Sequence, residues 1–417
     1  MIQIVNKEDC VGCGACVQRC PKECITLRED AEGFLYPEAD ASVCVECGLC
    51  EKVCPVLHPG ESRQPLMAYA AVNGDEAVRR SSSSGGVFTA LALETIARGG
   101  VVFGARFDER WEVVHGWTET AEGLAAFRGS KYVQSRMGES YREAEAFLKS
   151  GREVLFSGTP CQVAGLRRYL RKDYGGLRTV DFICHGVPSP GVWRDYLKEE
   201  VARQCDGKNT VSLAPNCGRD TLLEGVSFRN KAWGWKKYSF SLSLSLPGGQ
   251  GTKNSVFLCE LLTENAYLRG FLSDLYLRPS CHACPAKCLR SGSDVTVGDY
   301  WGVGAVHPEL DDDGGVSVVL VNTAAGREMV GGLNGVRLTP TRYADVLRFN
   351  PAVERSARVP AGRETFFSRW QGGESFRSVV LDLTRLSASR RLKVTLRNLL
   401  ERVGILEGLK RIKYKLS

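Results

Sequence analysis

Two cysteine runs with the same spacing constrain the fold of this chain more than any other feature. Each has the form Cys-x-x-Cys-x-x-Cys-x-x-x-Cys-Pro, and they cover residues 10–21 and 44–55. This is the spacing of bacterial two-cluster ferredoxins, in which three cysteines of a run bind one iron–sulfur cube and the fourth binds the other cube. A structural zinc site normally needs only two pairs of cysteines. The runs therefore predict a ferredoxin domain over residues 1–58 and a protein that transfers electrons.

The crossed pattern assigns four thiols to each of two [4Fe–4S] clusters. The ligands expected for the first cluster are Cys10, Cys13, Cys16 and Cys54. Those expected for the second cluster are Cys44, Cys47, Cys50 and Cys20. Each short loop can bring three sulfurs to one cube, while the Cys-Pro step carries the fourth sulfur away.

The distribution of charge limits the classes of partner. The net charge is +7, but residues 375–417 hold eleven Lys and Arg against three acidic residues, so the rest of the chain is close to neutral. We therefore expect no nucleic-acid binding by the core. Leucines at helical spacing within 392–406 predict a basic amphipathic helix, which could contact an anionic membrane surface, its own domain or a partner.

The start of the chain shows no secretory signal pattern, and no apolar stretch reaches the eighteen residues of a membrane span. These features predict a cytoplasmic protein with at most peripheral contact at the inner face of the membrane. Seventeen cysteines are then read as reduced thiols or metal ligands.

Beyond a Pro- and Gly-containing linker at 59–66, the apolar pattern predicts alternating strands and helices. Strands are expected at 67–72, 101–107, 154–157, 179–184, 295–297 and 316–321, with helices at 87–97, 162–170 and 191–202. Period-two alternation within 222–262 predicts an antiparallel hairpin. The expected fold class is an α+β and α/β multidomain protein, in which a two-cluster ferredoxin domain precedes a mixed-sheet α/β domain over 67–345. A C-terminal extension with a basic helix covers 346–417.

A further group of cysteines lies in the larger domain. Cys281, Cys284 and Cys288 have cluster-like spacing, and Cys161 and Cys184 follow predicted strands, where α/β domains place cofactor loops. Five thiols are thus available for a third [4Fe–4S] cluster. Buried, inert cysteines would explain any one of them alone. Four others are expected to be ordinary core or surface residues: Cys24, Cys205, Cys217 and Cys259.

Two segments could bind a phosphate group. A Ser/Gly loop at Ser84, Gly85 and Gly86 runs into a predicted helix that contains Thr89, and a helix N-terminus favours an anion. A capped turn would have the same sequence pattern. The second segment contains Ser130, Lys131, Tyr132 and Ser135, and a solvated turn would explain it equally well.

These motifs together resemble the family of coenzyme F420 hydrogenase/dehydrogenase beta subunits, in its bacterial form with a fused ferredoxin domain. The resemblance is carried by Ser84-Gly85-Gly86-x-x-Thr89, Ser130-Lys131-Tyr132-Val133-Gln134, Gly158-Thr159-Pro160-Cys161-Gln162, Cys184-His185-Gly186, Phe228-Arg229-Asn230-Lys231 and Arg278-Pro279-Ser280-Cys281-x-x-Cys284, followed by Gly298-Asp299.

The resemblance implies FAD and a [4Fe–4S] cluster in the larger domain. It ranks Cys161, Cys184, Cys281 and Cys284 first as ligands, with Cys288 as a competitor. It also implies FAD contacts at the Ser/Gly loop, at the segment Ser130–Ser135, and at Gly158 and Thr159. The expected function is an iron–sulfur flavoprotein oxidoreductase.

Electrons would pass between the ferredoxin clusters, the third cluster and FAD, because a flavin converts single electrons into the pairs that organic acceptors need. The expected partners are a redox protein or ferredoxin-like donor and a small organic acceptor or deazaflavin-type carrier. His185 is a candidate proton donor, although a packing role beneath its loop would fit as well. The alternative is a subunit that relays electrons to a partner enzyme and has no organic substrate of its own.

Overall fold

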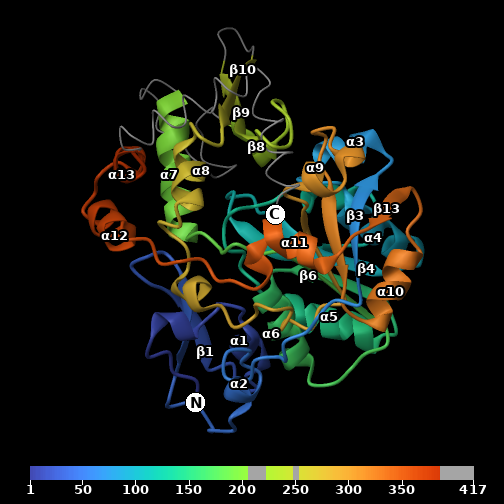
Figure 1. Ribbon diagram of the computed structural model, residues 1–417. Helices are drawn as coiled ribbons and strands as arrows, with labels where there is room; N and C mark the ends of the chain where they lie inside the picture. The colour runs from blue at the N-terminus through green and yellow to red at the C-terminus, as the bar shows by residue number, and fades with distance from the viewer. Residues whose placement is uncertain (205–221, 248–252, 386–417) are drawn as a thin grey trace.

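The structure is a computed structural model that describes residues 1–204, 222–247 and 253–385 (Figure 1). Its centre is an eight-stranded mixed sheet with strand order β13-β3-β12-β11-β7-β6-β4-β5. The strands are β3 (Met67–Asn73), β4 (Val101–Phe107), β5 (Val113–Thr118), β6 (Val154–Gly158), β7 (Leu177–Phe182), β11 (Val295–Asp299), β12 (Ser317–Val321) and β13 (Val336–Pro340).

Four neighbouring strands of this sheet, β4, β6, β7 and β11, run parallel to one another. The remaining strands extend the sheet in antiparallel fashion on both sides. The mixed α/β fold predicted from the sequence is confirmed, with β5 and β13 as edge strands that the pattern did not predict. Since the carboxyl ends of parallel strands meet at one edge of a sheet, the loops after β6 and β7 are placed side by side there.

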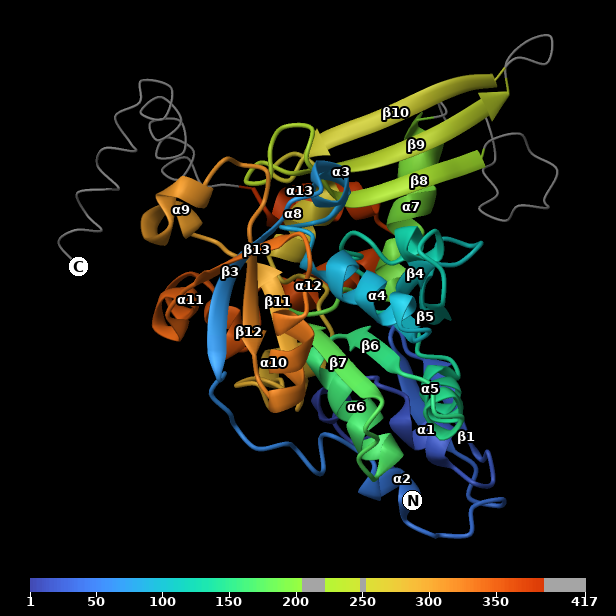
Figure 2. The same ribbon diagram turned by 90° about the vertical axis from the view of Figure 1, so that its right-hand side faces the viewer.

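Helices cover both faces of the sheet (Figure 2). Phe103 and Phe156 point into a core with α5 (Ser140–Lys149) and α6 (Pro160–Leu170). Their neighbours Val102 and Leu155 point into the opposite core, beneath α4 (Val87–Ala97). This alternation follows from the two-residue period of a strand. The remaining helices of this part are α3 (Glu76–Ser81), α9 (Val303–Val306), α10 (Ala324–Gly331) and α11 (Tyr343–Phe349).

A second sheet with its own helices packs beside the first. It has three antiparallel strands, β8 (Leu222–Asn230), β9 (Ser239–Pro247) and β10 (Lys253–Leu261), so the expected hairpin is extended by one strand. Its helices are α7 (Pro190–Gln204), α8 (Ala266–Leu272), α12 (Arg363–Gln371) and α13 (Phe376–Leu383). Phe366 and Phe376 share one buried core with Trp193 and Tyr267. The described part of the 346–417 segment therefore contributes to the core of this layer.

The ferredoxin part packs against both layers at the lower end of Figure 1. It consists of α1 (Ala15–Arg19), α2 (Leu49–Lys52) and the antiparallel pair β1 (Ile25–Glu29) and β2 (Leu35–Ala39). Phe34 and Tyr36 belong to the aromatic core of α7 and α8. Val11 and Cys13 belong to the core of α5 and α6. The ferredoxin part thus shares its hydrophobic cores with the rest of the molecule.

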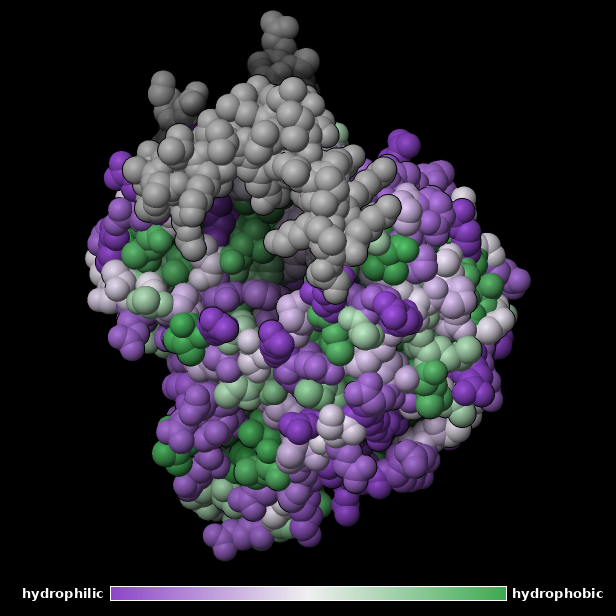
Figure 3. Space-filling view, viewed as in Figure 1, coloured by the Kyte–Doolittle hydropathy of each residue, from purple (hydrophilic) through white to green (hydrophobic). Residues whose placement is uncertain are grey.

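The face shown in Figure 3 is mostly hydrophilic, with hydrophobic residues in separate patches. None of the helices that the structure describes is long and apolar enough to cross a bilayer. The amphipathic helix predicted within 392–406 lies outside the described residues, as do Cys205 and Cys217.

Candidate iron–sulfur and flavin site

The structure brings together the four thiols expected at the first ferredoxin cluster. Burial raises the pKa of Cys13, and the neighbouring charges of Cys16, Cys10 and Cys54 raise it further. Cys54 of the second run thus acts on the pKa of Cys13 and of Cys16 in the first loop, as the crossed pattern predicts. The clustered thiols suit a positively charged metal centre, which stabilises their thiolate forms.

The thiols expected at the second cluster line a separate cavity. Its wall contains Cys20 from the first run together with Cys44, Cys47 and Cys50 from the second. Cys47 is exposed, so this site lies at the protein surface. Cys24 also lines the cavity, and its sulfur lies 3.4 Å from that of Cys20. The sequence interpretation treats Cys24 as an ordinary residue, although its position four residues after Cys20 could have indicated this contact.

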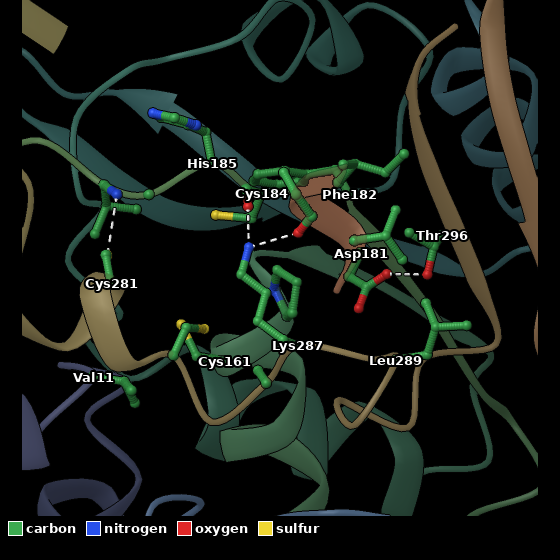
Figure 4. A pocket seen from close by; sticks show the side chains of 18 of the residues that line it. Val11, Cys161, Asp181, Phe182, Cys184, His185, Cys281, Lys287, Leu289 and Thr296 are labelled. Carbon is green, nitrogen blue, oxygen red and sulfur yellow. Dashed lines mark hydrogen bonds between the residues drawn. The ribbon is translucent and has the colours of Figure 1, made fainter. Parts of the chain in front are cut away.

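A third cavity lies at the carboxyl ends of β6 and β7 (Figure 4). Four of the five candidate thiols of the larger domain line it: Cys161, Cys184, Cys281 and Cys284. Cys161 is on the first turn of α6, which begins at this point because Thr159 caps it and Pro160 starts it. Cys184 follows β7, and Cys281 lies in a 3-10 turn over Pro279–Ala283.

The fifth candidate, Cys288, does not line this cavity. It has a left-handed backbone with φ of 58°, and its thiol faces the carbonyl of Glu354 at 3.8 Å. The four remaining thiols surround a space instead of converging on one point. Within the described ranges, no group of three or more His, Cys, Asp or Glu side chains is placed to hold a single metal ion. This arrangement fits a cube of several irons better than one ion.

Two cations counteract the electrostatic effect of burial at this cavity. Burial raises the pKa of Cys161, Cys184 and Cys281 to about 12 in each case. Arg278 lowers the pKa of Cys161 and Cys281, and Lys287 lowers that of Cys184. The cavity thus offers thiols and positive charge together, as an anionic iron–sulfur centre requires.

One acidic side chain lines the same cavity, and a second contacts a lining residue. Asp181 is 1% exposed, and burial raises its pKa to about 6 although Ser291 and Thr296 donate hydrogen bonds to it. At the cavity mouth, His185 Nε2 lies 2.5 Å from Asp274 Oδ1. The candidate proton donor is therefore held by a carboxylate beside the cavity.

The first ferredoxin site and the third cavity are neighbours. Val11, between two predicted ligands of the first cluster, lines the wall of the third cavity. On α6, a Cβ at Gly165 would lie 3.0 Å from the sulfur of Cys13. The helix that carries Cys161 therefore also contacts the first cluster loop.

The Ser/Gly loop and the Ser130 segment also meet. The backbone N–H and the hydroxyl of Ser130 both donate to Ser83 Oγ, at 2.6 and 2.9 Å. Gly85 packs so tightly that a Cβ would lie 2.4 Å from the carbonyl oxygen of Ala71, and Gly86 starts α4 with φ of 85°. Thr89 is buried within that helix.

An arginine connects the two loops. Arg229 is 5% exposed and donates to Ser83 O at 3.2 Å, to Tyr132 Oη at 3.2 Å and to Asp299 at 2.7 Å. Its Nε is buried, with no hydrogen-bond partner among the residues that the structure describes. An unsatisfied cationic N–H beside a Ser/Gly loop at a helix start suits an anionic group such as a pyrophosphate.

The other predicted flavin contacts have different surroundings. Lys131 Nζ donates to three backbone carbonyls, of Ala126, Arg128 and Gly129. Ser135 Oγ accepts from Gln162 and contacts His115. Gly158 ends β6, and Thr159 caps α6 with its Oγ1 3.1 Å from the sulfur of Cys161. Lys131 and Ser135 thus form hydrogen bonds within the protein, and Thr159 lies beside a thiol of the third cavity.

Aromatic rings connect the cavity mouth with the Ser/Gly loop region. The ring of His185 meets the edge of Phe271 at a centroid distance of 5.6 Å, and Phe271 stacks on Tyr132 at 4.5 Å. Since Tyr132 accepts a hydrogen bond from Arg229, the chain of contacts runs from the third cavity to the two loops.

Comparison with known proteins agrees with these observations. Residues 9–57 match the 4Fe-4S dicluster domain. Residues 68–141 match the N-terminal part of the beta subunit in the family described as coenzyme F420 hydrogenase/dehydrogenase, and residues 151–335 match the C terminus of the same subunit. Both cysteine runs thus lie in a segment that matches an iron–sulfur domain.

The chain is 27% identical over 215 residues to one subunit of the F(420)H(2) dehydrogenase of Methanosarcina mazei, and the match covers 48% of this chain and 61% of that protein. It is also 27% identical over 194 residues to the coenzyme F420-dependent sulfite reductase of Methanocaldococcus jannaschii, covering 45% of this chain and 29% of that protein. The matches thus span less than two thirds of either relative.

A solved structure, of the F420-reducing [NiFe] hydrogenase complex from Methanosarcina barkeri, aligns with a TM-score of 0.42 and 17% identity, covering 76% of this chain and 92% of that chain. The two consecutive beta-subunit matches, which lie within residues 68–335, establish the relationship by sequence. The chain is an iron–sulfur protein that belongs to the family of coenzyme F420 hydrogenase/dehydrogenase beta subunits and carries a 4Fe-4S dicluster domain.

Proposed function

We propose that this chain is a flavin-dependent iron–sulfur oxidoreductase that passes electrons between its ferredoxin clusters and a small organic acceptor or deazaflavin-type carrier. The observation that carries the proposal is the third cavity, which four cysteines line and whose wall includes Val11 from the first cluster loop. A third [4Fe–4S] cluster held by Cys161, Cys184, Cys281 and Cys284 would lie next to the first cluster.

The positions of the sites suggest an order for electron transfer. The second cluster site is at the surface, where Cys47 is exposed, and suits exchange with a protein partner. The first cluster site lies next to the third cavity. The aromatic contacts from His185 to Tyr132 then lead to the Ser/Gly loop.

The residues around that loop would bind FAD. Arg229, with its free Nε, and the start of α4 would bind the pyrophosphate, while Ser83 and Ser130 hold the two loops together. When bound, a flavin supplies the conversion between one-electron and two-electron transfer. His185, in the wall of the third cavity, would hold a proton at Nε2 against Asp274.

Cofactor content tests the proposal. Anaerobically purified protein is expected to contain about twelve irons per chain, for three four-iron cubes, and one FAD. Cys161→Ser should lower the iron to about eight, whereas Cys288→Ser, the matched control, should leave it near the wild-type value because Cys288 faces Glu354. Iron near eight in the unmutated protein, or an absence of flavin, would refute the proposal.

A relay subunit without an organic substrate is the second candidate, and the surface position of the second cluster site favours it. Reduction of a free deazaflavin by the isolated, dithionite-reduced protein distinguishes the two functions. Turnover supports the oxidoreductase. Full cofactor content with no turnover on deazaflavins or other small acceptors supports the relay.

A further inference from the structure

Arg278 is a fully buried cation between two of the cluster sites. It is 1% exposed and directly precedes the 3-10 turn that contains Cys281. Its guanidinium donates three hydrogen bonds: Nε to the carbonyl of Cys10 at 2.7 Å, Nη1 to Gln134 Oε1 at 2.9 Å, and Nη2 to the carbonyl of Leu35 at 3.0 Å. One side chain thus connects the first cluster loop, β2 and the third cavity.

All these partners are neutral. The guanidinium also lies over the ring of Tyr36 at 4.2 Å and near that of Phe34 at 5.4 Å. Among the ion pairs found in the described part of the chain, none includes Arg278. The nearby Arg363, which donates to the carbonyl of Leu277, does pair with Glu32. Burying a charge without a counter-ion is costly, and hydrogen bonds offset this cost only in part.

The first cluster loop approaches the guanidinium very closely. Gly12 has φ of 69°, and a Cβ there would lie 2.9 Å from Arg278 Cζ and 2.6 Å from Gln134 Nε2. No other residue type fits without displacing the arginine. Along the chain, the backbone N–H of Cys281 donates to the carbonyl of Arg278 at 2.9 Å, so Arg278 is also tied to the turn that carries a thiol of the third cavity.

Each neighbouring site, when loaded, supplies negative charge. Four thiolates outweigh the charge of a four-iron cube, and each added electron makes the cluster more negative. Arg278 therefore lies between two anions that would compensate its charge, and this explains why a buried arginine there pairs with no carboxylate of the described residues.

We propose that Arg278 is the shared counter-ion of the first ferredoxin cluster and the third cluster, and that its charge raises the reduction potential of both. This inference rests on the proposed function for the third cluster. An electron that leaves the first cluster and arrives at the third stays beside the same guanidinium, so its transfer requires little rearrangement of charge.

A second buried cation provides a comparison. Lys287 lines the third cavity, is 9% exposed, and donates to the carbonyls of Cys184 at 2.7 Å and Ala352 at 2.6 Å (Figure 4). Its hydrogen bonds reach the loop of Cys184 and the backbone of Ala352, and neither reaches the first cluster loop. Its charge should therefore act on the third cluster alone.

Redox titration of the anaerobic full-length protein, followed by electron paramagnetic resonance, tests the inference. Cys161→Ser identifies the signal of the third cluster by its loss. In Arg278→Gln, the reduction equilibria of the first and third clusters should each shift at least tenfold toward the oxidised state, which is 59 mV for one electron. Lys287→Gln should shift the third cluster only, and the matched control Arg363→Gln should shift neither.

Arg278→Lys separates charge from packing. It keeps the positive charge but loses the fork of hydrogen bonds, so both potentials should stay near the wild-type values. A tenfold shift of either potential in Arg278→Lys would overturn the inference. This test holds even where Arg278→Gln does not fold. Three loaded clusters with unchanged potentials in Arg278→Gln would overturn it too. Iron near eight per chain would instead refute the proposed third cluster.

Discussion

At the scale of single residues, His115 shows how burial changes the chemistry of a side chain near the site. It lies on β5 and is 8% exposed, with Nδ1 2.9 Å from Ser135 Oγ and Nε2 3.0 Å from the carbonyl of Ser157. The carbonyl can only accept, so Nε2–H donates a hydrogen bond to it, and in the neutral ring Nδ1 accepts a hydrogen bond from the serine hydroxyl. Burial lowers the pKa of His115 to about 4, and the nearby charge of Lys131 adds to this effect.

This lowered pKa predicts a loss of stability in mild acid. Between pH 6.5 and 4 the unfolded chain binds a proton at His115 and the folded protein does not, so stability rises with pH across this window. From pH 7.5 down to 5.5, the wild type should lose on the order of 1 kcal/mol more of unfolding free energy than His115→Gln. Anaerobic denaturant titrations at the two pH values measure the difference, and equal losses in both proteins would contradict the prediction.

Residue identity alone left the candidate ligands of the proposed third cluster open, because five thiols satisfied the same chemistry. Cys288 follows the spacing of the run as well as Cys284 does. What separates them is backbone geometry, since a left-handed residue at 288 turns its thiol toward Glu354. Local spacing does not encode that direction.

At the scale of elements, α6 determines how close the first cluster site and the third cavity lie. The helix carries Cys161 at one end and contacts the loop of Cys13 through Gly165. A Cβ at Gly165 would lie 2.8 Å from Tyr141 Oη, which donates to the carbonyl of Gln162, and 3.0 Å from Cys13. The backbone of Gly165 is not in the left-handed region, so backbone conformation does not require glycine here. The close approach of Tyr141 and Cys13 does.

Gly165→Ala should therefore destabilise the protein although alanine favours a helix. The added methyl must displace Tyr141 or the Cys13 loop, which costs about 1–3 kcal/mol. We also expect an altered resonance signal of the first cluster. Denaturant unfolding together with spectroscopy of the reduced protein measures both effects.

The matched control is Gly331→Ala, at the end of α10, where a Cβ would meet no atom within 4 Å. This variant should be unchanged or stabilised by about 0.4–1 kcal/mol. A Gly165→Ala protein as stable as the control would show that α6 and the cluster loop are less tightly packed than the structure indicates.

The elements themselves were predicted where one pattern dominates. The expected helix at 87–97 and strand at 101–107 match α4 and β4 in their bounds, because glycines flank the helix and the strand lies between a glycine pair and Asp108. The edge strands β5 and β13 were missed because their patterns are short and mixed. Pairing with a neighbouring strand, which the sequence does not show directly, determines such edges.

At the scale of the whole molecule, the ferredoxin part is joined to the other layers through shared cores. Phe34 and Tyr36 pack with α7 and α8, and Val11 and Cys13 pack with α5 and α6. Polar contacts add to this interface, since Gln18 accepts from the backbone N–H of Tyr141 at 2.9 Å and Arg363 pairs with Glu32.

We therefore expect the cluster-loaded protein to unfold in one cooperative transition. Bleaching of iron–sulfur absorbance and loss of far-ultraviolet circular dichroism should coincide along an anaerobic denaturant titration. Bleaching that is complete while most of the dichroism remains would show that the ferredoxin part unfolds on its own. Arg363→Gln should unfold at lower denaturant, because its ion pair with Glu32 is lost. The two transitions should still coincide, because the shared cores remain.

The sequence by itself determined the two-cluster iron–sulfur domain, the mixed α/β class and the family, because these follow from cysteine spacing, strand periodicity and motifs that lie within short segments. The tertiary structure decided which sites are neighbours. It placed the first cluster loop against the third cavity, turned Cys288 away, and buried Arg278 between the two sites. The physical reason is that these features depend on contacts between segments far apart in the chain, whose relative positions are set by core packing and strand order.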